Sequence, residues 1–457
     1  MGFIERALSV FWRADQPVAH QRSFDAALGG RRWASTPTFG STASEVAAAA
    51  PLVRSRARKL ANDNAWLRNA TQNWVGALVG TGHRPIARTD DAAMRETLST
   101  AFENWGEDCD SSGRRDWSGI QADLARHLVV DGEGLALLED SPDGLRVRVI
   151  PPEHLDESKT TQLSGGHVIV NGVELDARSR PVAYWILPNH PTDLLATGRE
   201  SVRVDAANVI HIFDPLGSGQ IRGLSWLAPA ALPAADLDKL TDALLMSAQV
   251  AALHAGWVTD PSQMGAAPFE GDGSTLDLSM EPGTVRLLPP GCDVKFSSPE
   301  SMADAPAFVR LHLQQLAAAL GLPEHLLSGD LRMANFSSLR ASLIIFRQRV
   351  EQVQRTVLTP QLFRPVWRRW IATEILADRL DIDADTRADW LGPKVPHVDP
   401  LKDLEATEKA LELGLTSRSA AITETGRSPA EVDQEIAADR EREAALNLNF
   451  GDVENDN

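Results

Sequence analysis

The sequence predicts an α+β protein that carries several long amphipathic helices in its second half. Three observations lead to this fold class. Short strand-like runs separated by turn signals lie between residues 134 and 213. Apolar residues recur at three- and four-residue spacing in 233–254, 303–320 and 337–358. The strands follow one another as hairpins rather than as repeated strand-helix-strand units, which is typical of an α+β arrangement.

The N-terminal part predicts helices before the strands begin. Residues 1–45 are rich in polar residues, Gly and Ser, and we expect an extended arm with a short helix at its start. One long helix is expected over 51–78, because a proline is tolerated in a first turn and the sequence Gly80-Thr81-Gly82 is a suitable helix end. Two further helical patterns lie between 92 and 129.

The strands are expected to form antiparallel hairpins. The apolar run 134–138 is followed by strand patterns at 146–150, 167–170, 182–186 and 209–213. The turn signals Pro142-Asp143-Gly144 and Asn171-Gly172 separate them. A second region with strand character, rich in Gly and Pro, occupies about 256–300.

The narrow apolar stripes of the three later helices suit either ordinary core helices or helices that pack side by side around an assembly. The tail after about residue 430 is acidic and low in aromatic residues, so we expect it to be partly disordered.

Charge and composition limit the possible function. The formal net charge of −18 argues against a protein that grips DNA by neutralising phosphates. Residues 401–457 contain fourteen acidic and six basic side chains. An acidic chain still suits a passage for DNA, because like charges prevent the backbone from sticking. We expect no signal peptide, no membrane span and a cytoplasmic site of synthesis.

No motif predicts a catalytic, cofactor or metal site. The loop Gly217-Ser218-Gly219-Gln220-Ile221-Arg222-Gly223 resembles a dinucleotide loop, but its third glycine is one residue late, so a tight turn is expected. The GxxxxGK[ST] phosphate loop is absent. Cys109 and Cys292 match no metal-ligand spacing, and the acidic residues Asp108, Asp110, Glu153 and Asp156 form no catalytic pattern.

A basic cluster lies near the start of the long helix. It contains Arg54, Arg56, Arg58 and Lys59. Either it forms a solvated face or it contacts DNA or an acidic neighbour.

Five blocks of the sequence resemble the lambda-type family of tailed-phage portal proteins, and the resemblance runs from about residue 24 to 445. The most specific block is the strand 209–213 followed by Asp214-Pro215-Leu216 and by Gln220-Ile221-Arg222-Gly223-Leu224-Ser225-Trp226-Leu227-Ala228-Pro229. The others, in chain order around it, are Phe24-Asp25-Ala26-Ala27 with Gly30-Arg31-Arg32-Trp33; 54–64 leading into Val79-Gly80-Thr81-Gly82; 335–343; and Gly414-Leu415-Thr416-Ser417 with Gly426-Arg427-Ser428-Pro429.

The resemblance implies a dodecameric ring at one capsid vertex, with an α/β wing, a helical stem, a small α/β clip and a helical crown. It also implies a virion protein, present in the host cytoplasm during assembly, that lets double-stranded DNA pass. The implied partners are terminase, the major capsid protein and head-tail connector or adaptor proteins. By order along the chain, 1–45 is an arm, 46–232 and 337–360 are wing, 233–254 and 303–320 are stem, 255–302 is clip, 321–336 is the tunnel loop region, 361–430 is crown and 431–457 is an acidic tail.

The candidate residues for the DNA channel follow from that map. Asp330, Arg332, Met333 and Asn335 lie in the expected tunnel loop and are candidates for touching DNA, and Asp236, Asp238 and Asp242 are candidates for a repulsive lining. Two other functions stay open at this point, namely a nucleotide-binding enzyme that uses the glycine loop, and a capsid or tail structural protein without a DNA channel.

Overall fold

Two antiparallel sheets in the main body pack against each other through a small apolar cluster. The computed structural model describes residues 40–193, 200–252, 257–259, 286–288, 305–332, 335–393 and 399–448. The first sheet has the order β3-β2-β9, formed by Gly144–Ile150, Glu133–Ser141 and Val209–Phe213. The second has the order β4-β5-β6-β7-β8, formed by Thr161–Gln162, Val168–Val170, Val173–Leu175, Pro181–Ile186 and Val202–Asp205. The predicted strands are therefore present, and the sequence reading missed the short strands β4, β6 and β8.

Strand β2 is buried on both of its faces. Leu135 points to a small apolar cluster between the sheets, with Ile150, Val209 and Tyr184. Ala136, next along the strand, belongs to the main core on the other side. Burial on both sides explains why the sequence here is a continuous apolar run rather than an alternating one. The Asn171-Gly172 turn between β5 and β6 has φ of 48° and 82°, the left-handed values that a two-residue hairpin turn needs.

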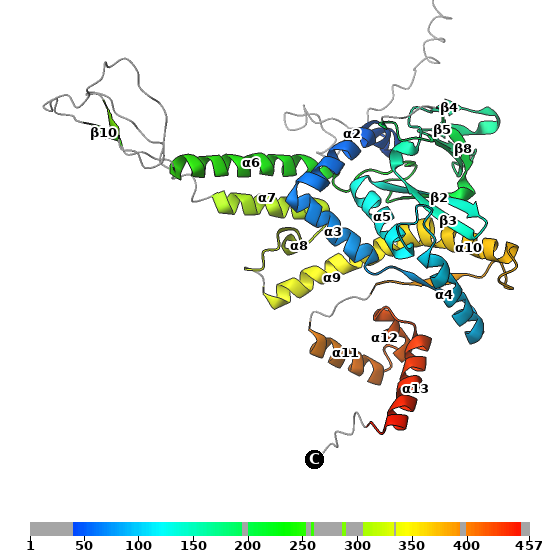
Figure 1. Ribbon diagram of the computed structural model, residues 1–457. Coiled ribbons are helices and arrows are strands. Elements are labelled where there is room, and N and C mark those ends of the chain that lie inside the picture. The colour runs from blue at the N-terminus through cyan, green and yellow to red at the C-terminus, as the bar shows by residue number, and fades with distance from the viewer. Residues whose placement is uncertain are drawn as a thin grey trace, which may run out of the picture.

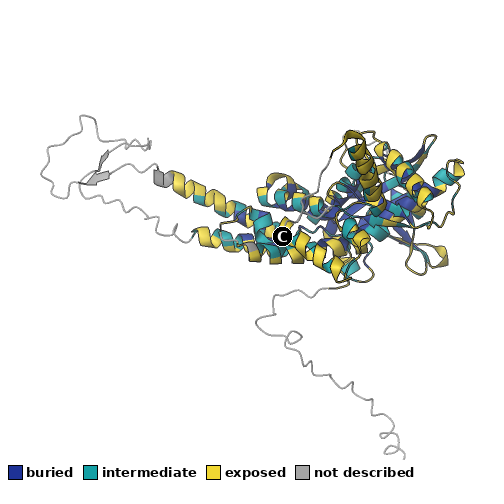
Figure 2. Cartoon of the chain, turned by 90° about the horizontal axis from the view of Figure 1, so that it is seen from below, coloured by how far each residue is buried: buried dark blue, intermediate teal, exposed yellow. Residues whose placement is uncertain are grey.

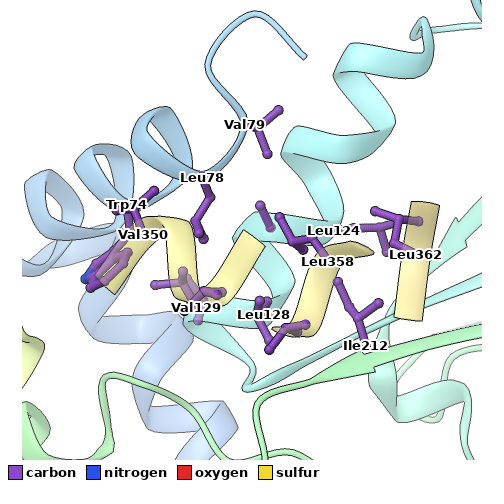
Figure 3. Packing of buried hydrophobic residues seen from close by; sticks show 14 of the residues in the cluster. Trp74, Leu78, Val79, Leu124, Leu128, Val129, Ile212, Val350, Leu358 and Leu362 are labelled. Carbon is purple, nitrogen blue, oxygen red and sulfur yellow. The ribbon is translucent and has the colours of Figure 1, made fainter. Parts of the chain in front are cut away.

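Helices cover the other face of the first sheet. Helix α3 (Ala65–Val79), α5 (Trp117–Val130), α9 (Phe336–Val353) and the π-helical segment η6 (Gln354–Phe363) meet in one apolar core. Figure 3 shows side chains from residues as distant in sequence as Trp74, Leu128 and Leu362 in that core. Buried Ile120, Leu124 and Leu128 occupy the stripe of α5 that the sequence predicts.

The helix expected over 51–78 is two helices, α2 (Thr42–Asp63) and α3. Asn64 separates them with extended backbone (φ −89°, ψ 121°). Its side chain accepts a hydrogen bond from the Leu67 N–H at 2.9 Å and so starts α3 as an N-cap. Ser41 caps α2, so Pro51 lies inside the helix rather than in its first turn. The last residues of the predicted arm, 42–45, belong to α2.

The fold continues without a break across residue 360, where a boundary between wing and crown is expected from the sequence. The chain continues through Pro360 in η6, where Thr359 Oγ donates to the Gln354 carbonyl at 2.8 Å. Proline has no N–H for a regular helical bond, and the wider π-helical turns accommodate it. Helix α10 (Arg364–Leu376) then belongs to the main core.

An aromatic cluster ties α10 to the main body. Phe102 on α4 (Ala92–Glu107) lies 5.1 Å from Trp370 and 5.5 Å from Trp367, measured between ring centroids. Strand β12 (Ala388–Leu391) pairs with β1 (Arg84–Ala87). Trp390 on β12 stacks on Phe363, with 4.6 Å between the ring centroids. Residues 361–391 are therefore part of the same folded body as α3, α5 and the first sheet.

The C-terminal part is helical over most of its length. It consists of α11 (Pro400–Glu412), α12 (Arg418–Glu424) and α13 (Pro429–Leu446), which Figure 1 shows beside the main body. The acidic tail expected to be partly disordered from 431 is therefore helical as far as 446. Most of the predicted arm (1–39) and the last residues (449–457) lie outside the described residues.

Candidate functional site: the projecting helices and their attachment

Two helices project side by side from the body. They are α6 (Ala228–Ala252) and α7 (Ala305–Leu320), and both views show them extending away from the sheets (Figures 1 and 2). Helix α6 begins five residues before the expected 233 and carries Pro233 in its interior, so the proline does not mark its start. Figure 2 shows mostly exposed residues along the outer part of α6, which includes the exposed Leu245 and Met246. Of the connecting segment, the structure describes β10 (Trp257–Thr259) and β11 (Arg286–Leu288), which pair in parallel.

The base of the two helices is fixed to α3. Trp74 Nε1 donates to the Leu320 carbonyl at 3.0 Å at the end of α7. Asn69 Nδ2 donates to the carbonyls of Leu326 and Leu327, on the short helix α8 (Glu324–Ser328), at 2.8 and 2.9 Å. The buried Leu237 of α6 adds an apolar contact. The two helices therefore leave the body in a defined direction.

The three candidate aspartates on α6 have different surroundings. Asp238 accepts hydrogen bonds from Asn64 Nδ2 at 2.9 and 3.0 Å, so it attaches α6 to the α2–α3 junction. Asp236 is exposed and pairs with Lys239 at 3.3 Å, and Asp242 is exposed one turn beyond Asp238. At about 100° per residue, Asp242 lies about 140° around the helix from Leu237 and about 120° from Asp236. The three carboxylates therefore do not form one row.

The loop before α9 brings two of its candidates together. Arg332 donates to Asp330 through Nε at 3.0 Å and Nη2 at 2.8 Å, and its backbone N–H donates at 2.9 Å. These hydrogen bonds hold the pKa of the Asp330 carboxyl well below its ordinary value. The guanidinium group stays accessible, since the side chain of Arg332 is 88% exposed.

Asn335 has a structural role that sequence reasoning missed. Its side chain accepts from the Ser338 N–H at 2.8 Å, and the Ser338 hydroxyl accepts from the Asn335 N–H at 3.2 Å. This reciprocal pair is a capping box that starts α9. Met333 lies outside the described residues.

A buried ion network holds the loop that leads into α6. Glu133, at the start of β2, is fully buried and accepts from Arg54 at 2.7 Å, Arg222 at 2.5 Å and His211 at 3.0 Å. It also accepts from the Gly223 N–H at 2.8 Å. Burial alone would raise the pKa of Glu133, but the charge of Arg222 and the hydrogen bonds from His211 and Arg222 outweigh it and hold this pKa well below its ordinary value.

The network joins segments that are far apart in sequence. Arg54 comes from α2, His211 from β9, and Arg222 from the loop between β9 and α6. Glu157 adds a second carboxylate at 2.9 Å from Arg54 and 3.1 Å from Arg222. The only signal in the sequence was the presence of both arginines in the blocks that resemble the portal family.

Arg58 forms a second network beside the first. It binds Asp131 at 2.6 and 2.9 Å and Glu153 at 2.6 and 2.8 Å. His127 binds Asp131 at 2.5 Å, and the hydrogen bonds from His127 and Arg58 lower the pKa of Asp131 against the effect of its burial. The solvated-face interpretation of the basic cluster is therefore wrong for Arg54 and Arg58, whose acidic neighbours lie within the chain.

Gly132 and Gly223 allow two backbone segments, at the start of β2 and before α6, to approach each other closely. A Cβ at Gly132 (φ 89°) would lie 2.1 Å from the Leu224 carbonyl carbon, and one at Gly223 would lie 2.1 Å from the Gly132 carbonyl oxygen. The preceding strand β9 is antiparallel to β2, so no parallel strand-helix-strand unit surrounds the loop. The loop is therefore a turn between strand and helix, as predicted. Its surroundings differ from a dinucleotide-binding fold, which needs parallel strands.

Other candidate groups have structural partners. Cys109 is buried, and burial raises the pKa of its thiol to about 12. Asp110 accepts hydrogen bonds from Ser112, Arg114 and Arg115 within its loop. Within the described ranges, no group of three or more His, Cys, Asp or Glu side chains is arranged to hold a metal ion. None of the helices described is long and apolar enough to cross a membrane.

The molecule is thus an elongated α+β protein with two projecting helices, attached through hydrogen bonds at their base and through a buried ion network in the loop that leads into α6. A family model described as "Phage portal protein, lambda family" matches residues 29–354. A relative from Halomonas phage phiHAP-1, described as "Probable portal protein", is 27% identical over 376 residues, which is 78% of this chain and 72% of the relative.

Two solved structures are also similar. One comes from the neck of an empty gene transfer agent particle (14% identity, TM-score 0.47, 82% of this chain and 94% of that chain). The other is a portal protein of the HK97 family from Corynebacterium diphtheriae (13% identity, TM-score 0.35, 77% of this chain and 98% of that chain).

The sequence match over most of its length shows that the chain belongs to the lambda family of phage portal proteins. It is a subunit of the portal ring that serves DNA packaging in a phage particle. The resemblance found in the sequence is confirmed.

Proposed function

We propose that the chain assembles as a dodecamer whose α6 and α7 helices form the wall of a DNA channel. The observation that carries this proposal is the pair of projecting helices side by side with a largely exposed surface, attached to the body by Asn64–Asp238 and by the Glu133 network. Neighbouring helix pairs packed around a ring would cover their flanks and leave one face to the lumen.

In this proposal α6 and α7 are the stem, 255–302 the clip and 321–336 the tunnel loop region. The wing comprises 46–232 and the α9 region, and it extends through α10 and β12 because these share its core. The crown then begins near α11 rather than at 361. The arm is 1–45 and the acidic tail is 431–457, as expected from order along the chain.

The DNA-facing residues follow from exposure. Asp236 and Asp242 are proposed as a repulsive lining, because both are exposed and lie away from the buried side of α6. Asp238 instead holds α6 in place. Arg332 is proposed to touch DNA phosphates with Asp330 as the group that orients it, Asn335 shapes the loop, and Met333 stays a sequence-based candidate.

We further propose that the ring is not itself an enzyme and that terminase supplies the energy for packaging. The major capsid protein and the head-tail connector or adaptor proteins are the other proposed partners, with assembly in the host cytoplasm. The nucleotide-binding alternative lacks support from the fold, because the glycine loop follows an antiparallel strand. Saturable binding of ATP or NAD by the purified chain would revive it.

Negative-stain electron microscopy of the purified full-length protein tests the channel. We expect end-on class averages of rings with a central hole wide enough for duplex DNA. Monomers under all salt and protein concentrations would contradict the ring, and rings without a hole would favour a capsid or tail structural protein. An Asp236→Asn/Asp242→Asn ring tests the lining, and we expect it to retain more duplex DNA at low salt than the wild-type ring.

A further inference from the structure

The C-terminal helices form a unit without a core of its own. None of the described residues from 399 to 448, which make up α11, α12 and α13, is buried. Polar contacts link the unit to the body, among them Arg340 to Asp403 at 2.6 Å and Gln434 to Glu96 at 3.2 Å. Ordering three helices costs conformational entropy that apolar burial normally offsets. The unit therefore needs a further surface to cover it.

Helix α11 shows which of its faces is uncovered. Its face with Asp403, Thr407 and Ala410 is half-buried, and Asp403 on this face binds Arg340 of the body. The adjoining face, about 100° further around the helix, carries an apolar stripe in which Leu401 is 69%, Leu404 60% and Leu411 38% exposed. Residues at this spacing lie on one side of a helix.

Three acidic residues share that exposed face. Glu405, Glu408 and Glu412 are all exposed; Glu408 lies between Leu404 and Leu401 around the helix, and Glu405 and Glu412 lie beside Leu401. The surface that covers α11 must therefore be partly apolar and positively charged. The same carboxylates argue against DNA phosphates as the covering surface.

Helix α9 presents a surface of that complementary kind. Ile345 is 70% exposed on its outer side, and Ile344 and Arg349 are exposed nearby. Arg355 follows in η6, where it is exposed and pairs with Glu351 at 2.8 Å. The segment 336–373 contains seven arginines and a single acidic residue, Glu351, in a chain whose net charge is −18. By contrast, 399–448 contains twelve acidic and six basic residues.

We infer that the leucine and glutamate face of α11 docks on the isoleucine and arginine face of α9 in a second copy of this chain. The described residues of one chain leave this leucine stripe exposed, and a second copy of the chain can supply the face that covers it. A closed ring with head-to-tail interfaces meets this need, because every subunit gives one face and receives the other. The inference rests on the proposed ring and adds which surfaces join its subunits.

Hydrogen exchange measured by mass spectrometry on full-length protein tests the inference without DNA or other proteins. In purified rings we expect α11 amides to exchange at least about tenfold more slowly than in monomers. Peptides that contain Ile345 should gain protection in the same rings. The Leu401→Glu/Leu404→Glu variant should lose the extra protection at both places. Leu376→Glu, at a position that is 89% exposed at the end of α10, is the matched control and should behave as wild type.

The possible outcomes separate the inference from the proposed function. Rings in which α11 exchanges as fast as in monomers would overturn the inference while leaving the channel intact, and would point to another protein as the covering partner. Protection of α11 without any change at Ile345 would also overturn it, because the docking face would then lie elsewhere. Failure to form rings under any condition would overturn the proposed function and the inference together.

Discussion

Replacing the buried carboxylate of Glu133 by an amide should destabilise the protein strongly. Glu133→Gln keeps the size of the side chain but removes the negative charge shared by Arg54, Arg222 and His211. The two arginine side chains are only 1% and 4% exposed, so water does not replace the lost partner. Removing one partner of a buried ion pair costs about 3–5 kcal/mol.

Urea denaturation of the full-length chain, followed by tryptophan fluorescence, measures this loss. We expect a lower midpoint with an unchanged slope, because a change in midpoint alone reports stability. Glu157→Gln is the matched control, since it removes a carboxylate bound to the same two arginines but 29% exposed. It should cost about 1 kcal/mol or less. Equal losses for the two variants would refute the reasoning.

The pH dependence gives a second check on Glu133. Its pKa is depressed in the folded protein, so its contribution is complete above the unfolded-state pKa of about 4.3. The contribution is lost as the pH falls through the lower folded-state value. The stability difference between wild type and Glu133→Gln should therefore be constant from about pH 6 to 8 and shrink below about pH 4. A difference that grows on acidification would contradict the assigned charge state.

Three further predictions concern local features of the fold. Asn64→Ala removes the cap of α3 and both hydrogen bonds to Asp238. It should lower the free energy of unfolding by about 2 kcal/mol in urea denaturation. The control Ser41→Ala, at the exposed cap of α2, should cost about 1 kcal/mol or less. Gly132→Ala should destabilise the chain by more than about 1 kcal/mol, because the new Cβ would clash with the backbone of Leu224. The control Gly113→Ala, also at positive φ but in open space, should cost less. Equal urea midpoints for the two variants would contradict the close approach. In a Cys292→Ser background, Cys109 should resist a thiol reagent at pH 8 until the chain unfolds. Because burial raises the pKa of its thiol in the folded protein to about 12, the free energy of unfolding should fall as the pH rises above about 9. Rapid labelling of the folded protein would contradict its burial.

The buried networks also explain how a long projection is held at a fixed direction. Helix α6 is reached through a loop whose Arg222 and Gly223 both bind Glu133, and its third turn binds Asn64 through Asp238. Each contact links the start of α6 to the body formed by α2, α3 and β2. Because these bonds are buried or half-buried, salt screens them less than it would screen surface pairs.

The sequence alone was sufficient for the class of fold, for most helices and strands and for the family. These features depend on local or short-range rules. Apolar residues at a period of two or near 3.6 identified β9, α5 and the projecting helices, the Asn171-Gly172 pair identified a hairpin, and five ordered blocks indicated the lambda-type portal proteins.

Only the tertiary structure decided the partners of the charged residues and the limits of the folded body. Arg54 and Arg58 look like a solvated cluster in sequence, because nothing local shows that Glu133 and Asp131 lie beside them. Asp238 looks like Asp242 until Asn64 is seen to bind it. Pro360 looks like a helix end, yet packing of Trp367 and Trp370 keeps the chain helical beyond it. In each case contacts between residues distant in sequence outweigh a local preference, since burial and ion pairing are worth several kcal/mol and propensity is worth less than one for most residues.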